Sequence, residues 1–322
     1  MGNPQKRKVN AMSELILRTR ELTRRYGHTL ALDRASLSVE KGQILGLVGR
    51  NGAGKTTLIR LISGQSRPTS GELTLFDASS PAALDRARSR TGVMVETPAF
   101  YPYLTAQQNL EYYRIQRGIP GRSCVDKALE LVRLTGAGKK KFKTFSLGMK
   151  QRLGLALALM NQPEFLLLDE PINGLDPEGI VEFRELLLRL NRERQTTILI
   201  SSHILSELSA LATHYAFIDR GRMLETISAA DLRERCRDCL ELRVDDAARA
   251  ARVLEEQLGT RDFEVLPQER LRLYAFLDQP QTVNRVLMEE GVGLISAQQK
   301  DSNLEDYFLS LIDGHSAGKE GA

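Results

Sequence analysis

A glycine-rich segment with a lysine and a threonine carries the clearest chemistry in this sequence. Residues 49–56 read Gly-Arg-Asn-Gly-Ala-Gly-Lys-Thr, which fits the pattern G-x-x-x-x-G-K-[ST]. Glycines let a backbone wrap around a phosphate and turn its N–H groups inward. Lys55 would supply positive charge to the outer phosphates, and the Thr56 hydroxyl would bind Mg²⁺. The residues expected to bind phosphate are Gly49, Asn51, Gly52, Ala53, Gly54, Lys55, Thr56 and Thr57.

Two acids follow a second apolar run further along the chain. Residues 165–168 read Phe-Leu-Leu-Leu and precede Asp169 and Glu170, as at the carboxyl end of a buried strand. Beside the phosphate loop, Asp169 would hold Mg²⁺ and Glu170 would polarise the water that attacks the terminal phosphate. Each pattern alone has a structural alternative, a glycine-rich turn or a helix cap. Together they favour a nucleoside triphosphatase.

Both motifs need strands that deliver them to one edge of a sheet. The apolar run at 44–48 predicts a buried strand before the glycine loop, and a helical pattern follows it from Lys55 to Ile62. Further strands are predicted at 92–95, 165–168, 196–201 and 215–219, and residues 105–160 read mostly as helix. Strands that alternate with helices are typical of a largely parallel sheet covered on both faces.

The pattern changes near residue 228. Between 240 and 297 it predicts strand, helix, strand, strand, helix and strand, the order of a ferredoxin-like α+β domain. A last helix is predicted at 304–312. We therefore expect a disordered tail at 1–11, an α/β domain at 12–228 with a helical subdomain at about 97–160, an accessory α+β domain at 229–313 and a disordered tail at 314–322.

Composition excludes several classes of protein. The 322 residues are 42% hydrophobic and carry 45 Lys and Arg against 41 Asp and Glu, which argues against disorder and gives no indication of a nucleic-acid partner. No apolar run approaches the roughly 18–20 residues of a membrane-spanning helix. Three cysteines suit a reducing compartment, and we interpret the Cys236/Cys239 pair as helix packing rather than a zinc site. We expect a cytoplasmic protein.

Residues 145–152, Phe-Ser-Leu-Gly-Met-Lys-Gln-Arg, lie between the two motifs and look like a signature segment followed by its helix. With them, residues 14–227 resemble the ATP-binding cassette (ABC) ATPases. The resemblance implies a P-loop fold of the ABC type, with a mostly parallel sheet, an antiparallel β part and a helical subdomain. It implies ATP and Mg²⁺ as ligands. It also implies that the partner subunit's ATP is contacted by Ser146, Leu147, Gly148 and Met149.

Other residues gain roles only through this resemblance. Tyr26 matches the aromatic residue that stacks on adenine, with a plain surface tyrosine as the alternative. Asp176 matches the D-loop, and His203 matches the switch histidine that touches the γ-phosphate, so both Glu170 and His203 are expected to be catalytic. Glu96 stands where the family has glutamine; a carboxylate suits Mg²⁺, so we expect Thr56, Glu96 and Asp169 on the metal side.

A finer resemblance comes from Glu96 and from the stretches at 100–105 and 304–308. These look like the ATPase subunits of bacitracin-resistance, lantibiotic-immunity and related multidrug exporters. The chain contains one glycine loop and one signature segment, so the ABC resemblance implies that two chains meet head to tail, as a homodimer or heterodimer on the inner face of the cell membrane. It also implies a separate integral-membrane permease, whose coupling helix docks near 97–115. The chain itself would not insert into the membrane.

Several alternatives stay open at this point. Phe100, Tyr101 and Tyr103 suit a socket for the coupling helix or a local core. The α+β domain would serve dimer contact, regulation or partner contact. The competing functions are an ABC ATPase without a transport role and a regulatory nucleotide-binding protein, against which Glu170 argues.

Overall fold

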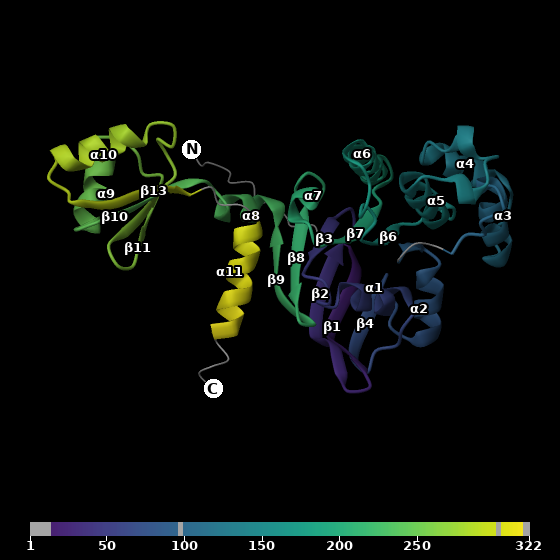
Figure 1. The fold of residues 1–322 in the computed structure, drawn as a ribbon. Helices are drawn as coiled ribbons and strands as arrows, with labels where there is room; N and C mark the ends of the chain where they lie inside the picture. Colours follow the sequence, from purple (N-terminus) through teal and green to yellow (C-terminus); the bar gives the residue numbers. More distant parts are fainter. Residues whose placement is uncertain (1–13, 96–98, 301–303, 318–322) are drawn as a thin grey trace, which may run out of the picture. The chain divides into compact units, whose positions relative to one another are not determined.

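The computed structural model describes residues 14–95, 99–300 and 304–317 (Figure 1). The chain divides between Ala229 and Ala230 into two compact units. Each unit has its own hydrophobic core, so each is described by itself.

The first unit is built on a six-stranded sheet in the order β5-β6-β7-β3-β8-β9. All neighbouring strands are parallel except β8 and β9. Three of them, β3, β6 and β7, are buried at every residue, as expected of strands covered on both faces. The strands are β3 (Ile44–Val48), β5 (Thr91–Met94), β6 (Phe165–Asp169), β7 (Thr197–Ser202), β8 (His214–Asp219) and β9 (Arg222–Ser228).

A second, antiparallel sheet has the order β2-β1-β4. It consists of β1 (Leu15–Tyr26), β2 (Thr29–Glu40) and β4 (Ser70–Leu75). Side chains from this sheet, from α1 (Lys55–Ser63) and from the large sheet form one core, in which Leu58 and Ile62 of α1 are fully buried. The helix α2 (Pro81–Arg88) follows β4. This antiparallel part and the mostly parallel sheet confirm the predicted fold class.

The other helices of the first unit include those of the predicted helical subdomain (Figure 1). They are α3 (Ala106–Gln116), α4 (Ser123–Leu131), the 3₁₀ turns η1 (Thr135–Ala137) and η2 (Phe142–Thr144), α5 (Leu147–Leu159), α6 (Pro177–Arg194) and α7 (Leu205–Ser209). In Figure 1, α6 and α7 lie on one side of the large sheet, and α1 and the antiparallel sheet lie on the other.

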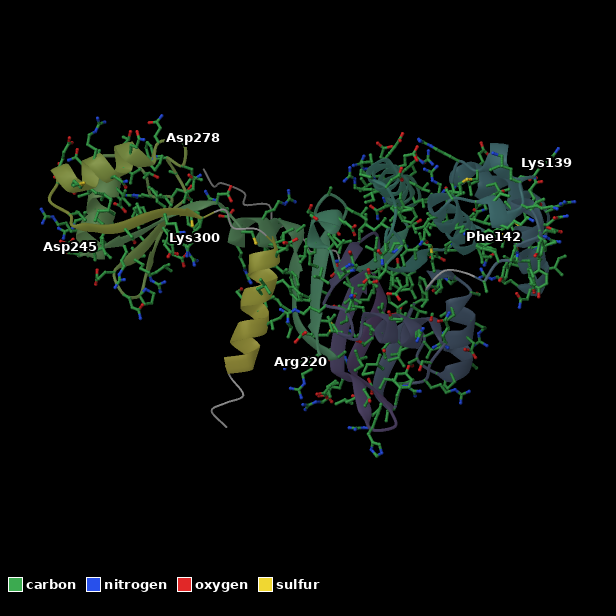
Figure 2. All side chains as sticks on the ribbon, in the orientation of Figure 1. Lys139, Phe142, Arg220, Asp245, Asp278 and Lys300 are labelled. Atoms are coloured by element: carbon green, nitrogen blue, oxygen red, sulfur yellow. The ribbon has the colours of Figure 1, made fainter. Side chains whose placement is uncertain are left out.

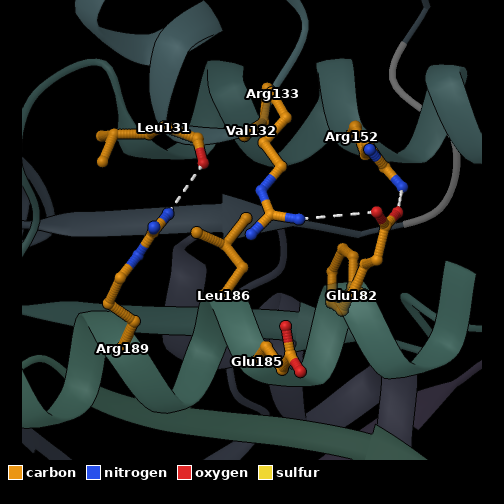
Figure 3. A pocket seen from close by; sticks show the side chains of 9 residues that line it. Leu131, Val132, Arg133, Arg152, Glu182, Glu185, Leu186 and Arg189 are labelled. Atoms are coloured by element: carbon orange, nitrogen blue, oxygen red, sulfur yellow. Dashed lines mark hydrogen bonds and ion pairs between the residues drawn. The ribbon is translucent and has the colours of Figure 1, made fainter.

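Ion pairs join α6 to the helical subdomain around a small cavity (Figure 3). Glu182 of α6 pairs with Arg152 of α5, and its other carboxylate oxygen lies 3.5 Å from Arg133, which follows α4. Arg189, two turns further along α6, donates a hydrogen bond to the Leu131 carbonyl at 3.2 Å. The end of α4 and the helix α5 therefore both contact one face of α6.

The second unit contains a four-stranded sheet in the order β11-β12-β10-β13, with every neighbouring pair antiparallel. Its elements follow one another as strand, helix, strand, strand, helix and strand, and this order with this pairing is the split-βαβ arrangement. They are β10 (Cys239–Val244), α9 (Ala247–Glu256), β11 (Phe263–Leu266), β12 (Arg270–Leu273), α10 (Pro280–Glu289) and β13 (Leu294–Lys300). The helix α8 (Ala229–Arg235) begins at the unit boundary.

The last helix, α11 (Leu304–Ala317), corrects one prediction. We expected a disordered tail from residue 314, but residues 314–317 are helical. A single glycine such as Gly314 costs a helix only about 1 kcal/mol relative to alanine, and no proline follows it to end the helix. The predicted tail at 1–11 and residues 318–322 lie outside the described residues. Within the described part of the chain, every helix is too short or too polar to cross a membrane.

Candidate active site

The glycine loop connects β3 to α1, as the motif requires. Gly52 and Gly54 have φ of +79° and +108°, a region that favours glycine. A Cβ atom on Gly49 would lie 2.5 Å from the Ile218 carbonyl oxygen, so this position also needs glycine. Gly54 caps the N-terminus of α1, where free backbone N–H groups attract anions.

The turn between β8 and β9 supports this loop from outside. The Gly221 N–H donates to the Ala53 carbonyl at 2.8 Å, and the Asp33 N–H donates to the Gly221 carbonyl at 2.8 Å. Arg222 Nε then donates to the Asp33 carboxylate at 2.6 Å, and this bond holds the pKa of Asp33 below its usual value. A continuous series of hydrogen bonds therefore links β2, the turn between β8 and β9, and the glycine loop.

The first acid of the predicted pair is held by two hydroxyls. Asp169 is 7% exposed. Its Oδ2 accepts a hydrogen bond from Thr56 Oγ1 at 2.7 Å, and its Oδ1 accepts one from Ser201 Oγ at 2.7 Å. Because both oxygens are bonded, the carboxylate has a fixed orientation next to the first turn of α1.

The second acid contacts two groups that the sequence places far away from it. Glu170 Oε1 lies 3.1 Å from Lys55 Nζ, and Glu170 Oε2 lies 2.6 Å from His203 Nδ1. The Lys55 ammonium is buried and also donates to the Gly49 carbonyl at 2.6 Å. The structure thus brings Lys55, Thr56, Asp169, Glu170 and His203 together at the carboxyl ends of β3, β6 and β7, where open α/β sheets place their sites.

Ser201 is a member of this cluster to which the sequence alone assigned no role. Its hydroxyl donates to Asp169 and accepts a hydrogen bond from the Glu170 N–H at 2.9 Å, so it fixes both acids. In the parallel pair of β6 and β7, Ser201 is the register partner of Asp169. The sequence shows only a hydroxyl residue at the end of an apolar strand. Whether this hydroxyl can bond both acids depends on which strand lies next to β6.

The signature residues and the D-loop residue lie side by side on a second surface. Ser146 caps α5 and accepts a hydrogen bond from the Met149 N–H at 3.3 Å. Asp176 caps α6 and accepts one from the Gly179 N–H at 3.3 Å. Residues 146–149 and 174–176 line one open groove, which we call the signature groove. Among the described residues that line it, none belongs to the glycine loop.

Two predicted site residues remain, Tyr26 and Glu96. Tyr26 ends β1 and is 42% exposed; the Arg24 guanidinium lies 4.3 Å from its ring centroid, and a hydrogen bond with Ser66 lowers its pKa. Glu96 lies in 96–98, outside the described residues.

For the aromatic residues at 100–103, the sequence left open a socket for the coupling helix or a local core, and the residues differ in this respect. Phe100 is buried, and its ring centroid lies 5.1 Å from that of Phe142, so it belongs to the local core. Tyr101 and Tyr103 are exposed, so they belong to the surface.

Comparison with known proteins decides the family. Residues 32–173 match the family model described as ABC transporter. The bacitracin transport ATP-binding protein BcrA of Bacillus licheniformis is 42% identical over 303 residues, which cover 94% of this chain and 99% of that protein. The chain belongs to the ABC transporter family. As an ABC transporter ATP-binding subunit, it is an ATPase that works with a membrane permease.

Two further relatives show how far the similarity extends. The lantibiotic transport ATP-binding protein SrtF of Streptococcus pyogenes is 38% identical over 209 residues, which cover 65% of this ABC subunit and 89% of that protein. The solved structure of cbiO1 from Clostridium perfringens, part of the ABC transporter complex cbiONQ, has a TM-score of 0.62 and 26% identity, and covers 68% of this chain and 90% of that one. The match to BcrA is long enough to include most of the second unit.

Proposed function

We propose that this ATPase subunit energises the export of a peptide antibiotic, a drug or a similar amphipathic solute through a separate membrane permease. The proposal is supported by the names of its relatives, which include bacitracin and lantibiotic transport proteins. The chain would act on the cytoplasmic face of the membrane, where the permease holds it. The solute itself need not touch this subunit.

For ATP binding, we assign the phosphates to residues 49–57 and the adenine ring to Tyr26. Lys55 places a buried ammonium at the loop, and the N-terminus of α1 adds backbone N–H donors. The Lys55 ammonium would exchange part of its bonding to the Gly49 carbonyl and to Glu170 for phosphate oxygens. The Tyr26 ring would stack on the base with the face that Arg24 leaves uncovered.

The residues present fit a magnesium ion. Thr56 and Asp169 already place a hydroxyl and a carboxylate oxygen 2.7 Å apart, and Mg²⁺ prefers hard oxygens of this kind. Phosphate oxygens and water would complete the set, with Glu96 as a further carboxylate on this side. Bound there, Mg²⁺ would neutralise negative charge on the phosphates. Ser201 would keep the Asp169 carboxylate oriented toward the ion.

For hydrolysis, we assign the general base to Glu170 and its orientation to His203. The observation that carries this assignment is the contact chain from Lys55 through Glu170 to His203, with distances of 3.1 and 2.6 Å. A carboxylate held in this way can accept a proton from an attacking water molecule. Lys55 lies next to the same carboxylate. The ammonium that would bind phosphate and the carboxylate that would accept a proton from water therefore belong to one site.

A complete site needs a second chain. The signature groove contains no residue of the glycine loop, so Ser146, Leu147, Gly148 and Met149 would contact ATP bound by a partner. In a head-to-tail homodimer or heterodimer, Asp176 would then lie near the boundary between the two sites. ATP binding would close the dimer, and hydrolysis would release it and drive the permease. Tyr101 would contribute to the coupling-helix socket predicted near 97–115, of which the structure describes residues 99–115.

The substitution Glu170→Gln tests this mechanism. General-base catalysis contributes roughly 10²- to 10⁴-fold, so we expect ATP hydrolysis by the variant to fall by about that factor. Uncleaved ATP should then hold the dimer closed, as measured by light scattering and by nucleotide retained after gel filtration. Glu193→Gln, an exposed change on α6, is the matched control. Monomers without retained nucleotide would contradict the shared-site proposal.

Export needs a separate experiment. The chain would first be purified from its native membranes, which identifies the integral-membrane protein that accompanies it. The chain and this membrane protein would then be expressed together in a bacitracin-sensitive host. We expect the pair to raise the bacitracin concentration that stops growth and Lys55→Ala to abolish this gain. Lys41→Ala, which removes an exposed lysine, should preserve it. Unchanged susceptibility to bacitracin and to a panel of lantibiotics would exclude this solute class.

A further inference from the structure

The helical subdomain carries far more positive charge than the chain as a whole. Residues 99–150 contain ten Lys and Arg against three Asp and Glu, a net charge of +7, whereas the whole chain has +4. The rest of the molecule is therefore slightly acidic. Four of the ten cations fall within five residues, at 139–143. No step of the proposed ATPase mechanism uses them.

The fold presents these lysines beside an exposed aromatic side chain. The Phe142 N–H donates to the Leu104 carbonyl at 3.0 Å, and the Lys143 N–H donates to the Pro102 carbonyl at 2.9 Å. Residues 139–143 are thereby held along the segment that carries Tyr103. The Lys143 ammonium lies 5.1 Å from the centroid of the Tyr103 ring, which is 73% exposed.

We call this surface the lysine patch; it consists of Lys139, Lys140, Lys141, Lys143 and Tyr103. All five side chains are exposed, and Lys139 lies at an outer end of the helical subdomain (Figure 2). Within the described part of the chain, none of the four lysines forms a salt bridge with a carboxylate. Four like charges that repel one another without internal compensation favour an external anionic partner.

We propose that the lysine patch binds the headgroups of anionic phospholipids at the membrane surface, without insertion. Lysine is a compact, strongly hydrated charge on a flexible stem, which suits diffuse attraction to a charged surface. Arginine, with its rigid fork, would suit fixed carboxylates on a protein better, and the four cations of this patch are all lysine. Tyr103 supplies an amphipathic ring of the kind that settles at headgroup level.

This interaction goes beyond docking to the permease, because it needs neither ATP nor a second protein. It would orient the helical subdomain toward the membrane and raise the rate at which the subunit finds its permease. Attraction of this kind is screened within about 10 Å at 0.1 M salt, so binding should weaken steeply as salt rises.

Vesicle flotation with the purified full-length chain tests the proposal. The vesicles would be phosphatidylcholine alone, or phosphatidylcholine with phosphatidylglycerol in equal parts. We expect binding only to the anionic vesicles, and a loss of roughly tenfold or more in affinity for the variant K139Q/K140Q/K141Q/K143Q. The control R192Q/R194Q/R252Q/R285Q removes four exposed positive charges elsewhere and should bind as the unaltered chain does.

Three results would overturn the proposal. The first is equal binding to neutral and anionic vesicles, and the second is equal affinity of the four-lysine variant and the unaltered chain for anionic vesicles. The third is tighter binding to polyglutamate than to anionic vesicles at matched charge, which would assign the lysine patch to an acidic protein segment. ATP hydrolysis by the variant, expected to be unchanged, verifies that it is folded and separates this result from a failure of the export proposal.

Discussion

At the scale of single residues, the conformation of Glu170 is the least expected feature of the site. Its φ of +48° lies in the left-handed region, which a non-glycine residue enters at a cost of roughly 1–3 kcal/mol. In return, the chain turns sharply at the end of β6, and the carboxylate contacts both Lys55 and His203. The Glu170 N–H is held at this turn by Ser201. The surrounding sheet thus holds Glu170 in a strained conformation that suits the general-base role proposed for its carboxylate.

Ser201→Ala should therefore damage the site without touching either acid. The change leaves a buried Asp169 oxygen and the Glu170 N–H without their hydroxyl partner, which costs about 1–3 kcal/mol. We expect a lower free energy of unfolding in urea and a higher Mg²⁺ requirement for ATP hydrolysis. Ser209→Ala removes an exposed hydroxyl that bonds only to its own helix, and it serves as the control. Equal stability of the two variants would show that Ser201 has no such role.

At the scale of elements, α6 connects the site to the helical subdomain. It begins directly after Asp176, and Glu182 lies less than two turns further along. Arg152 is placed in the same way on α5, six residues after Ser146. Their ion pair, extended to Arg133, therefore ties together the two helices whose N-termini form the signature groove.

Glu182→Ala would leave Arg133 and Arg152 facing each other without the carboxylate between them. Because this pair is partly exposed, we expect a loss of about 1 kcal/mol, concentrated at the contact between α5 and α6. Hydrogen exchange should rise in α5 and stay unchanged in β3. Glu185→Ala alters another carboxylate of the same cavity, one turn further along α6 (Figure 3), and is the control. Equal exchange in both variants would assign no special role to Glu182.

The bond between Asp33 and Arg222 predicts a pH dependence. The pKa of Asp33 is lowered in the folded chain, so its stabilising contribution is fully present above the ordinary aspartate pKa of about 3.9. The contribution is lost as the pH falls through the lowered value. We expect Asp33→Asn to reduce the free energy of unfolding at pH 7, and this deficit to shrink below about pH 4. A deficit that stays constant down to pH 3 would contradict this linkage.

Much of this organisation was readable from the sequence because its signals are local. The glycine loop and the apolar runs at β3, β6 and β7 each occupy a few consecutive residues, and the structure places them as strand, loop and helix. The role of Ser201 was not readable, because it depends on β7 lying beside β6. The lysine patch likewise depends on a pairing between residues 101–105 and 139–143 that periodicity does not reveal. The end of α11 was misjudged because glycine is only a weak terminator.

At the scale of the whole molecule, the two units have separate cores. The first unit contains every candidate site residue that the structure describes. The second unit adds a sheet with one face covered by α9 and α10, whose buried side chains include Leu254 and Leu287. The similarity to BcrA spans both units, so the second unit is part of the type of subunit that this chain represents. We propose that it serves dimer contact, regulation or partner contact.

The separation of the glycine loop from the signature groove has a genetic consequence. Two defective chains, one carrying Lys55→Ala and the other Ser146→Arg, would each be inactive alone. When they pair, one site combines the intact loop of one chain with the intact groove of the other, while its counterpart carries both lesions. Mixing the two purified variants should therefore restore ATP turnover that neither shows by itself. Complementation between alleles of a single gene would then be observed, and its absence would mean that every chain completes its own site.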